Sequence, residues 1–555
     1  MIIPGDIEYL PAIALRAGEV SLLYEEGRIR YLRAGNTDLL RMIYFALRDH
    51  KWDTIPYSVE GFSTVVDEDH FEIKFVAVYH HENIRFSADI LIRGSADNSI
   101  EFSFRGEAGS EFLSNRIGIC IHHPISTCSG REVHLIDSTG KPAATSSFPV
   151  NISPHQPLKD IREMQWNTTD GKKVRLKFEG EIFETEDQRN WTDDSFKTYC
   201  IPLERPFPIT TKAGSSIFQK VTVQVDKGGT AGSPPAISKA ESKVSFPALG
   251  YARRQGQERL APELTELFKD IPFDAYRVEL HLGNYQWKTV LDDATAESDM
   301  LDVPLQLSVF FDEFSDKETD ELIRALSPVK DQVSSVLILS GKHKIIPGDD
   351  YAKIFSRIRN TLKDIPIGYG TDTYFAELNR NRPGRLPADF LGFSLHPQVH
   401  MSDNRSILEN LGSQHHTLET IKSFAPALPV QISPVTLSAR FNPDKKGERV
   451  LLPADPRQYS SFAAWWTIKT IVNLADAQSV VFYQLTGDNG LVNIQEGDFK
   501  TSAVFDLLRE IKRFQPRYII RSSNWNQPLS DVILEDQEGR RLHISTDLPE
   551  PTIIQ

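Results

Sequence analysis

Residues 305–339 read LQLSVFFDEFSDKETDELIRALSPVKDQVSSVLIL, and they contain two apolar runs, 305–311 and 335–339. Short apolar runs of this kind are typical of strands buried on both faces of a parallel sheet. Between them, residues 316–326 have the length and apolar spacing of an amphipathic helix. The stretch therefore predicts a strand, a helix and a second strand in one βαβ unit.

The same alternation continues on both sides, over residues 241–515. We expect strands at 248–252, 275–282, 305–311, 335–339, 367–371, 390–395, 428–432 and 479–484. The expected helices are 261–269, 316–326, 349–362, 406–424, 459–473 and 503–514. Eight βα units over about 270 residues predict a (β/α)8 TIM barrel. A doubly wound open sheet is the alternative, but the region has no Gly-rich dinucleotide turn.

Residues 1–240 have a different pattern, in which β-branched and aromatic residues alternate with polar ones. Residues 71–79 (FEIKFVAVY) and 84–92 (IRFSADILI) are examples, and such alternation predicts half-buried strands. We expect an N-terminal antiparallel β-sandwich over 1–240, with one helix at 38–50. Residues 226–242 are rich in Gly, Pro and Ser and predict a linker before the barrel of 241–515. Residues 516–555 return to alternating strands and predict a short C-terminal β domain.

Composition and charge narrow the possible functions. The chain has 555 residues, of which 40% are hydrophobic and 25% charged, and its formal net charge is −14. Because no Lys/Arg-rich block is present to neutralise a row of phosphates, we expect no nucleic-acid partner. No run approaches the roughly 18 uncharged apolar residues that span a membrane, and charged residues interrupt the N-terminus where a signal peptide needs an apolar core. We therefore expect no membrane partner either.

The cysteines Cys120, Cys128 and Cys200 form no CxxC pair and are too few for a disulfide framework. A reducing compartment fits this best, so we expect a cytoplasmic protein. The sequence predicts no cofactor, and it leaves the oligomeric state open.

Barrel enzymes place their reactive groups at the C-terminal ends of the strands, where the loops converge on one face. Polar and titratable residues crowd these positions here. The candidate catalytic residues are Glu279 in the second strand, Asp372 and Glu377 after the fifth, and His400 after the sixth. The candidates for substrate binding at the exits of the last three strands are His396, Gln398, Arg440 and Tyr483. Such a rim favours an enzyme that acts on a hydroxyl-rich ligand.

Each of these residues also has a structural interpretation. Glu279 fits equally well as a buried ion-pair partner of Arg277 or Arg380, and the two histidines of the sixth loop fit as hydrogen-bonding residues that fix it. Adjacent histidines, as at 80–81, 122–123 and 415–416, resemble metal pairs, but neighbouring residues of a strand face opposite ways. We therefore expect no protein-bound metal.

Three segments of the sandwich region have an unusual density of polar and aromatic residues. They are 186–200, with Arg189, Asn190 and Trp191, then 122–131, with His123, and 153–162, with His155. One interpretation is solvated loops joined by a few salt links. The other is that these loops reach over the barrel mouth and that the five named residues bind substrate.

Five segments together suggest a family. They are SPHQPLKDIR (153–162), EDQRNWTDDSFKTYC (186–200), GTDTYFAELNRNRP (370–383), HPQVHMSDNRS (396–406) and SPVTLSARFNP (433–443). In these segments the chain resembles the D-apionate lactonases of bacterial apiose catabolism, which open a branched-chain sugar lactone with water. The order of the three predicted parts is also similar. The resemblance implies a lactonase in carbohydrate metabolism whose partner is a small carbohydrate lactone like D-apionolactone.

The residues agree with this implication in part. A retaining glycosidase on this barrel needs two carboxylates about 5 Å apart, typically at the ends of strands four and seven. Those ends read LSGKH (339–343) and SPV (433–435), without Asp or Glu. The chain also has no GxSxG elbow, which argues against a serine nucleophile. Lactone hydrolysis needs only a general base for water, donors for the carbonyl oxyanion and hydrogen bonds to the sugar hydroxyls.

Three functions remain open at this point. The first is a sugar lactonase, with Glu377 or Asp372 as general base and His400, Arg440 or Arg189 polarising the carbonyl. The second is a glycoside hydrolase with an atypical carboxylate pair, such as Glu279 and Glu377. The third is a non-catalytic carbohydrate-binding or scaffold protein.

Overall fold

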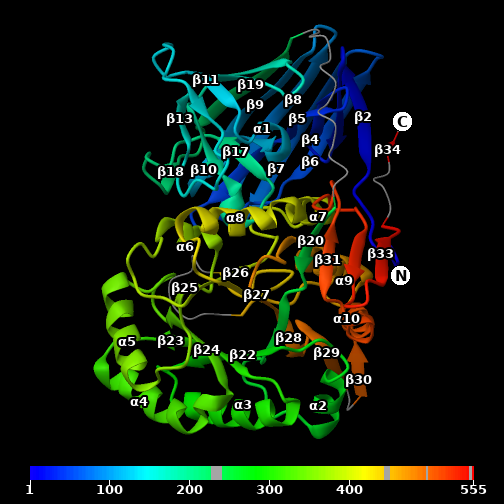
Figure 1. The fold of residues 1–555 in the computed structure, drawn as a ribbon. Helices are drawn as coiled ribbons and strands as arrows, with labels where there is room; N and C mark the ends of the chain where they lie inside the picture. The colour runs from blue at the N-terminus through cyan, green and yellow to red at the C-terminus, as the bar shows by residue number, and fades with distance from the viewer. Residues whose placement is uncertain (227–240, 443–450, 496–497, 549–552, 555) are drawn as a thin grey trace. The chain divides into compact units, whose positions relative to one another are not determined.

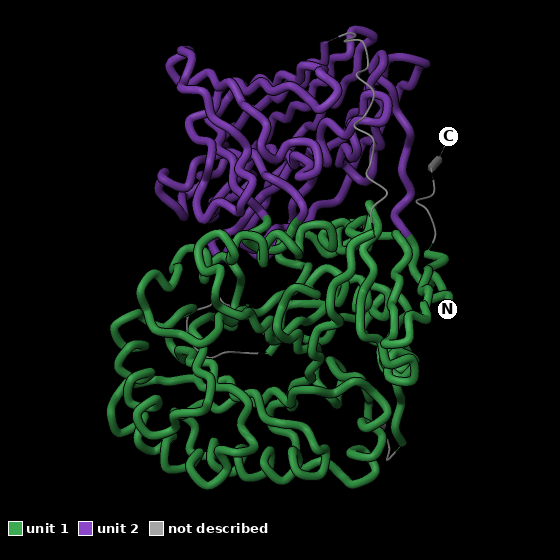
Figure 2. Tube along the Cα trace, in the orientation of Figure 1, with its two compact units in different colours: residues 1–8, 189–193, 238–549 green, residues 9–188, 194–237, 550–555 purple. Residues whose placement is uncertain are grey.

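The computed structural model describes residues 1–226, 241–442, 451–495, 498–548 and 553–554 (Figure 1). Its chain divides into two compact units, coloured in Figure 2. The first unit comprises residues 1–8, 189–193 and 238–549, and the second comprises 9–188, 194–237 and 550–555. The predicted linker at 226–242 falls almost wholly on residues 227–240, which lie outside the described residues.

The first unit contains a closed parallel barrel, which confirms the predicted TIM fold. Its strands are β21 (Ala248–Ala252), β22 (Ala275–His281), β23 (Leu305–Phe311), β24 (Val333–Ser340), β25 (Ile367–Gly370), β26 (Phe390–Leu395), β27 (Val430–Val435) and β28 (Ser479–Thr486). Each strand pairs in parallel with the next, and β28 pairs with β21, which closes the sheet. The strands are almost wholly buried, as expected when side chains fill the interior and helices cover the outside.

Helices follow most of these strands on the outside of the barrel (Figure 1). They are α2 (Pro262–Phe268), α3 (Trp287–Leu301), α4 (Asp316–Leu326), α5 (Gly348–Thr361), α6 (Phe375–Arg380), α7 (Asn404–Glu409), α8 (Gln414–Phe424), α9 (Ser461–Asn473) and α10 (Ala503–Phe514). Short 3-10 segments are η2 (Ser327–Gln332) and η3 (Asn410–Ser413), and a hairpin of β29 (Gly490–Gln495) and β30 (Asp498–Thr501) follows β28. The predicted helix at 406–424 is divided into α7, η3 and α8.

Helix α4 shows why these segments are helical. The Ser315 hydroxyl caps it by accepting a hydrogen bond from the Glu318 amide, and acidic residues occupy its positive N-terminal turn. Its buried face is formed by Leu322, Ile323 and Leu326. The capping residue and the apolar spacing indicate the same bounds, so the predicted helix at 316–326 coincides with α4.

Two antiparallel sheets form the second unit. One contains β13 (Leu158–Ile161), β16 (Phe183–Asp187), β17 (Ser195–Tyr199), β10 (Phe112–Pro124), β5 (Thr37–Asp49), β4 (Arg28–Ala34), β3 (Val20–Glu25) and β2 (Ala12–Ala17), with β18 (Ile209–Thr211) beside β10. The strand β34 (Ile553–Ile554) adds a parallel pairing to β2. The other contains β12 (Ser146–Ser147), β11 (Glu132–Ile136), β14 (Glu163–Asn167), β15 (Lys173–Glu179), β19 (Ser216–Val225), β9 (Ser99–Ala108), β8 (Ile84–Ser95), β7 (Phe71–His81) and β6 (Ser58–Val66).

The two sheets share one apolar core, which confirms the predicted sandwich. Phe45 of β5 meets Phe104 of β9 with ring centroids 4.2 Å apart. A short helix, α1 (Ile125–Cys128), follows β10, and the 3-10 segment η1 (Gln188–Trp191) follows β16.

The helix predicted at residues 38–50 is wrong, because these residues form β5. This strand lies inside its sheet between β4 and β10 and is buried along most of its length. A strand buried on both faces has no apolar–polar alternation, so periodicity alone does not distinguish it from a buried helix.

The predicted C-terminal strands are present, and they form part of a five-stranded sheet. Its order is β1 (Ile2–Ile3), β33 (Arg541–Thr546), β32 (Val532–Glu535), β31 (Tyr518–Arg521) and β20 (Ser242–Ser245). The two outer strands come from residues far from the C-terminus in sequence. None of the described helices has both the length and the apolar character needed to span a bilayer.

Candidate active site

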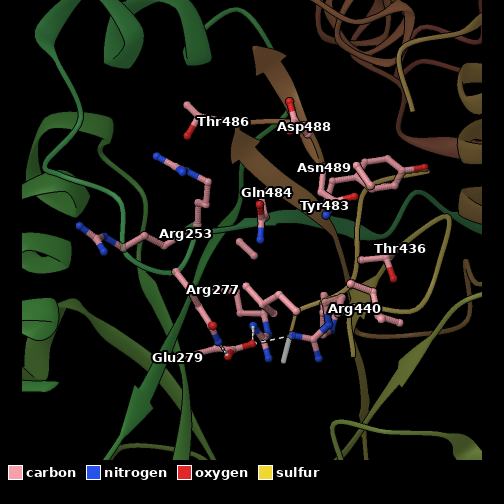
Figure 3. A pocket seen from close by; sticks show the side chains of 18 of the residues that line it. Arg253, Arg277, Glu279, Thr436, Arg440, Tyr483, Gln484, Thr486, Asp488 and Asn489 are labelled. Carbon is pink, nitrogen blue, oxygen red and sulfur yellow. Dashed lines mark hydrogen bonds and ion pairs between the residues drawn. The ribbon is translucent and has the colours of Figure 1, made fainter. Parts of the chain in front are cut away.

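Four charged side chains meet at the C-terminal ends of the barrel strands. Arg277 and Glu279 lie on β22, Asp372 follows β25 and Arg440 follows β27. The Oε1 atom of Glu279 accepts hydrogen bonds from Arg277 Nη1 at 2.6 Å and from Arg440 Nη1 at 2.7 Å (Figure 3). Arg440 Nη2 donates to Asp372 Oδ2 at 2.7 Å. Arg440 therefore joins the two carboxylates.

This cluster is buried and balanced in charge. The side chains of Arg277, Glu279 and Asp372 are at most 5% exposed, and that of Arg440 is 14% exposed. Burial lowers the pKa of Arg277, and Glu279 opposes the effect only in part. Burial also acts to lower the pKa of Arg440, but Asp372 and Glu279 outweigh it and raise that pKa. Arginine loses its proton only far above neutral pH, so both guanidinium groups stay charged.

A cavity of about 430 Å³ lies beside the cluster and takes in Arg277, Glu279 and Arg440 (Figure 3). Its other hydrogen-bonding side chains include Arg253, Arg254, Gln255, Thr436, Gln484, Thr486, Asp488, Asn489 and Asn493. Its apolar walls include Pro434, Leu451, Leu452 and Pro453. The volume and the many polar groups suit a small polyhydroxylated ligand.

Arg277 has hydrogen-bonding capacity left over. Within the described part of the chain, its Nε and Nη2 atoms have no hydrogen-bond partner, and Nη2 lies 4.0 Å from Asp372 Oδ2. A buried donor without a partner is costly, so such a group in a cavity wall is a candidate for contact with a ligand.

A second cavity, of about 230 Å³, shares residues 253–255 and Glu279 with the first. It is also lined by His281, whose Nε2 lies 3.1 Å from Glu279 Oε2. The imidazole stacks on Phe310 with ring centroids 4.2 Å apart, and Gln255 donates to the same Glu279 oxygen. We did not predict His281 as a site residue. It follows Glu279 by two positions on one strand, a spacing that puts both side chains on the same face.

His396, a predicted substrate-binding residue, lies next to the cluster. It lines a small depression together with Asp372 and Arg440, and its ring centroid is 5.6 Å from that of Tyr374. Burial, aided by the charge of Arg440 and by His400, lowers the pKa of His396 to about 3. The imidazole is therefore neutral near pH 7.

Glu377 and Tyr483 differ in their relation to the two cavities. Glu377 is half-buried in the first turn of α6, 3.7 Å from Lys344 Nζ, and lines neither cavity. Tyr483 lines the larger cavity, but its hydroxyl lies 2.8 Å from the Thr467 hydroxyl of α9. Burial raises the pKa of Tyr483 well above its usual value.

His400 and Gln398 also line neither of these two cavities. His400 Nδ1 is 2.5 Å from Asp193 Oδ2, and its ring meets Trp191 edge to face at 5.5 Å. Gln398 donates to the Leu437 carbonyl and to Asp455, both at 2.7 Å. These contacts fix loops, which for His400 is the structural interpretation given above.

The segment 189–193 belongs to the barrel unit although its neighbours in sequence belong to the sandwich. Asn190 accepts a hydrogen bond from Asn379 at 3.0 Å, and Thr192 donates to the His396 carbonyl at 3.1 Å. Arg189 is completely buried, and the Arg380 guanidinium lies 5.2 Å from the centre of the Trp191 ring. The predicted residues of this segment are thus packed side chains of the barrel unit.

The two histidines predicted in the sandwich region differ in burial. His123 is completely buried between Phe148 and Trp166, and its Nε2 lies 2.7 Å from the Thr198 hydroxyl. Burial lowers the pKa of His123 to about 3. In this structure His123 forms part of the sandwich core, and its role in substrate binding stays a prediction. His155 is exposed, and its role stays a prediction.

One group of side chains has the composition of a metal site. Ligand atoms of His415, His416 and Glu419 in α8 lie within 4.8 Å of one another. These histidines lie on a helix, so our strand-based reason against a metal does not apply to them. The positive charges of Arg521 and Arg189 act on His415 and oppose a cation there, so we assign no metal to this group.

Known proteins are similar to the chain over most of its length. A profile described as the N-terminal domain of D-apionate lactonase matches residues 7–228, and one described as the TIM barrel domain of D-apionate lactonase matches residues 249–516. The D-apionate lactonase of Brucella anthropi is 24% identical over 506 residues, which cover 86% of this chain and 83% of that protein.

Solved structures are similar only at a low level. An α-L-arabinofuranosidase from Thermotoga maritima has a TM-score of 0.42 and 10% identity, over 55% of this chain and 85% of that chain. A family 39 glycoside hydrolase from Bacteroides cellulosilyticus has a TM-score of 0.38 and 10% identity, over 74% of this chain and 82% of that chain. Neither likeness carries information about function.

Proposed function

The chain belongs to the D-apionate lactonase family, and from this premise we propose that it hydrolyses a sugar lactone at the cavity beside Arg277 and Arg440. The reaction opens the ring ester with water and yields the free aldonic acid. D-apionolactone or a lactone of similar size is the proposed substrate. The observation that carries the proposal is a cavity in which two buried guanidinium groups stand beside many hydroxyl-binding side chains.

The guanidinium groups have the chemistry to bind the lactone carbonyl. Attack by water turns the carbonyl oxygen into an oxyanion, and donors already oriented in a water-poor site stabilise that charge strongly. Arg277 offers Nε and Nη2, which have no hydrogen-bond partner in the described residues. Arg440 is held in place by its two carboxylate contacts. We propose that Glu279 and Asp372 serve mainly to orient these arginines.

The remaining polar side chains of the cavity suit the sugar hydroxyls. Gln484, Asp488 and Asn489 follow or end β28, and Thr436 follows β27. Amide, carboxylate and hydroxyl groups together both donate and accept hydrogen bonds. Such a mixture of donors and acceptors suits a ring with several hydroxyl groups, because each hydroxyl group both donates and accepts hydrogen bonds.

The sequence-based site residues are retained in part. We propose Glu279, Asp372, Arg440 and His396 as members of the site, since they line the cavity or contact the residues that do. We propose that Glu377 and His400 stabilise the fold by contacting Lys344 and Asp193, respectively.

We further propose that the reaction belongs to carbohydrate catabolism, as a step in the use of apiose, and takes place in the cytoplasm. The three cysteines are buried free thiols, which suits a reducing compartment. A lactonase would act on the product of a sugar dehydrogenase, because oxidation of a cyclic sugar at its anomeric carbon yields a lactone.

The proposal is tested by two assays on the purified full-length chain. In the first, a panel of aldonolactones is offered in weak buffer with a pH indicator, because ring opening releases one proton per ester hydrolysed at neutral pH. In the second, aryl glycosides report on glycosidase activity. Lactone hydrolysis above the uncatalysed rate, without aryl glycoside cleavage, supports the proposal. Aryl glycoside cleavage without lactone hydrolysis contradicts it and favours the glycoside hydrolase alternative.

A further inference from the structure

The contacts of Glu279 and His281 constitute a carboxylate–imidazole pair in a cavity wall. His281 Nε2 lies 3.1 Å from Glu279 Oε2, and the stacking on Phe310, with an angle of 5° between the ring planes, fixes the imidazole plane. Both side chains project from the same face of β22, near its C-terminal end. The pair is therefore held by the strand, by the ring stack and by one hydrogen bond.

The carboxylate determines which imidazole nitrogen carries the hydrogen. An ionised carboxylate only accepts hydrogen bonds, so the contact with Glu279 places the hydrogen on Nε2. The Gln255 amide nitrogen lies farther from Nε2, at 3.4 Å, and it is already bonded to Glu279. The lone pair of the neutral ring is therefore on Nδ1, which makes no hydrogen bond within the described part of the chain.

The imidazole is accessible as well as oriented. The side chain of His281 is 34% exposed, whereas that of Glu279 is 5% exposed. His281 lines the cavity of about 230 Å³ that shares residues 253–255 and Glu279 with the larger one. Water can therefore reach His281 on one side while Glu279 holds it on the other.

We propose that His281 is the general base of the reaction and that Glu279 is its positioning residue. The inference rests on the proposed lactone hydrolysis. Nδ1 takes a proton from water as the water oxygen bonds to the acyl carbon, and the carbonyl electron pair moves to its oxygen, next to Arg277. The tetrahedral intermediate then collapses, the bond from acyl carbon to ring oxygen breaks, and the imidazolium returns the proton to that ring oxygen. The product is a hydroxy acid, whose carboxyl group ionises.

The test uses His281→Ala in the full-length chain, with the lactone that the wild-type enzyme hydrolyses best. Loss of a general base is expected to lower kcat by about 10²- to 10⁴-fold while KM changes by less than about threefold. Added imidazole is expected to restore a large part of kcat, because it fits the space left beside Phe310 and supplies the missing base. The matched control is His134→Ala, an exposed histidine of the sandwich, which should have wild-type kcat with and without imidazole.

Each outcome decides between the two proposals. An active wild type with an inactive, imidazole-rescued His281→Ala supports the base. His281→Ala that keeps at least a third of kcat, or that loses it without rescue while its melting temperature is unchanged, overturns the base and leaves the lactonase in place. A wild type that hydrolyses no sugar lactone removes the proposed function and this inference together. Should the Ala variant not fold, His281→Gln preserves volume, and near-wild-type kcat in that variant overturns the inference.

Discussion

Replacing Arg440 by Met removes the side chain that joins the two carboxylates of the cluster. Arg440 makes 2.7 Å hydrogen bonds to both Glu279 and Asp372. After its removal Glu279 keeps Arg277 at 2.6 Å, whereas the Nη2 atom of Arg277 lies 4.0 Å from Asp372 Oδ2. Asp372 is 2% exposed, so the substitution takes the hydrogen-bonded Arg440 away from a buried carboxylate.

The loss expected for stability follows from that burial. Removing one partner of a buried ion pair costs about 3–5 kcal/mol, because the other charge stays buried without compensation. The double variant Arg440→Met/Asp372→Asn removes both charges and is expected to recover part of this loss. Arg440→Lys retains the charge but not the planar fork that reaches two carboxylates, so a smaller loss is expected. If Arg440 also binds the oxyanion, kcat of the Met variant should fall by about 10²- to 10³-fold.

The measurements are denaturant unfolding followed by tryptophan fluorescence, and lactone hydrolysis at saturating substrate. The structural reasoning is refuted if Arg440→Met unfolds within about 1 kcal/mol of the wild type, below the range for a broken buried pair. The reasoning is also refuted if adding Asp372→Asn to Arg440→Met lowers the free energy of unfolding as much as an independent substitution would. A stable variant with wild-type kcat would exclude Arg440 from the oxyanion contact.

Three further predictions concern residues outside the cluster. Glu377→Gln should keep kcat within about threefold, because Glu377 pairs with Lys344 and lines neither cavity; a fall of 10²-fold would restore it as a base candidate. His123 has a pKa of about 3 in the fold against an ordinary 6.5, so the unfolded chain binds more protons between these values and stability falls as the pH falls through that window. At pH 5, which is 1.5 pH units below 6.5, this group lowers the free energy of unfolding by about 2 kcal/mol. In urea unfolding, His123→Gln should therefore show a smaller difference in stability between pH 8 and pH 5 than the wild type. An equal difference in the two proteins would contradict the low pKa of His123. His400→Asn should speed amide hydrogen exchange in residues 189–193, whose Asp193 it holds at 2.5 Å, while changing kcat by less than about tenfold; unchanged exchange would count against this holding role.

The barrel was predictable from sequence because its strands are buried on both faces and read as apolar runs. The runs predicted at 305–311 and 390–395 coincide with β23 and β26. Helix α3 was missed although its buried face includes Trp287, Leu291 and Leu301, because Glu297 and Ser298 interrupt the apolar spacing. Glu297 is buried there because Arg253 pairs with it at 2.8 Å. A partner 44 residues away in sequence is not visible in the local pattern.

The sequence predicts the candidate site only where its residues lie at or just after the ends of strands. Glu279, Asp372 and Arg440 were placed at the rim because they end or follow strands, and they contact one another in the structure. The spacing of residues in the sequence does not show how far a loop carries a side chain away from the rim. His400 follows its strand as closely as Arg440 does, and Glu377 lies only two positions farther from its strand, yet their loops direct them to Asp193 and Lys344.

Glu279 combines the two halves of the proposed chemistry in one carboxylate. Its Oε1 atom accepts from Arg277 and Arg440, and its Oε2 atom accepts from Gln255 and His281. With both oxygens engaged by donors, Glu279 has little remaining capacity to take a proton from water itself. The same contacts orient the guanidinium groups on one side and select the imidazole tautomer on the other. We therefore propose that Glu279, a candidate catalytic residue by sequence, is the group that positions both the oxyanion donors and the base.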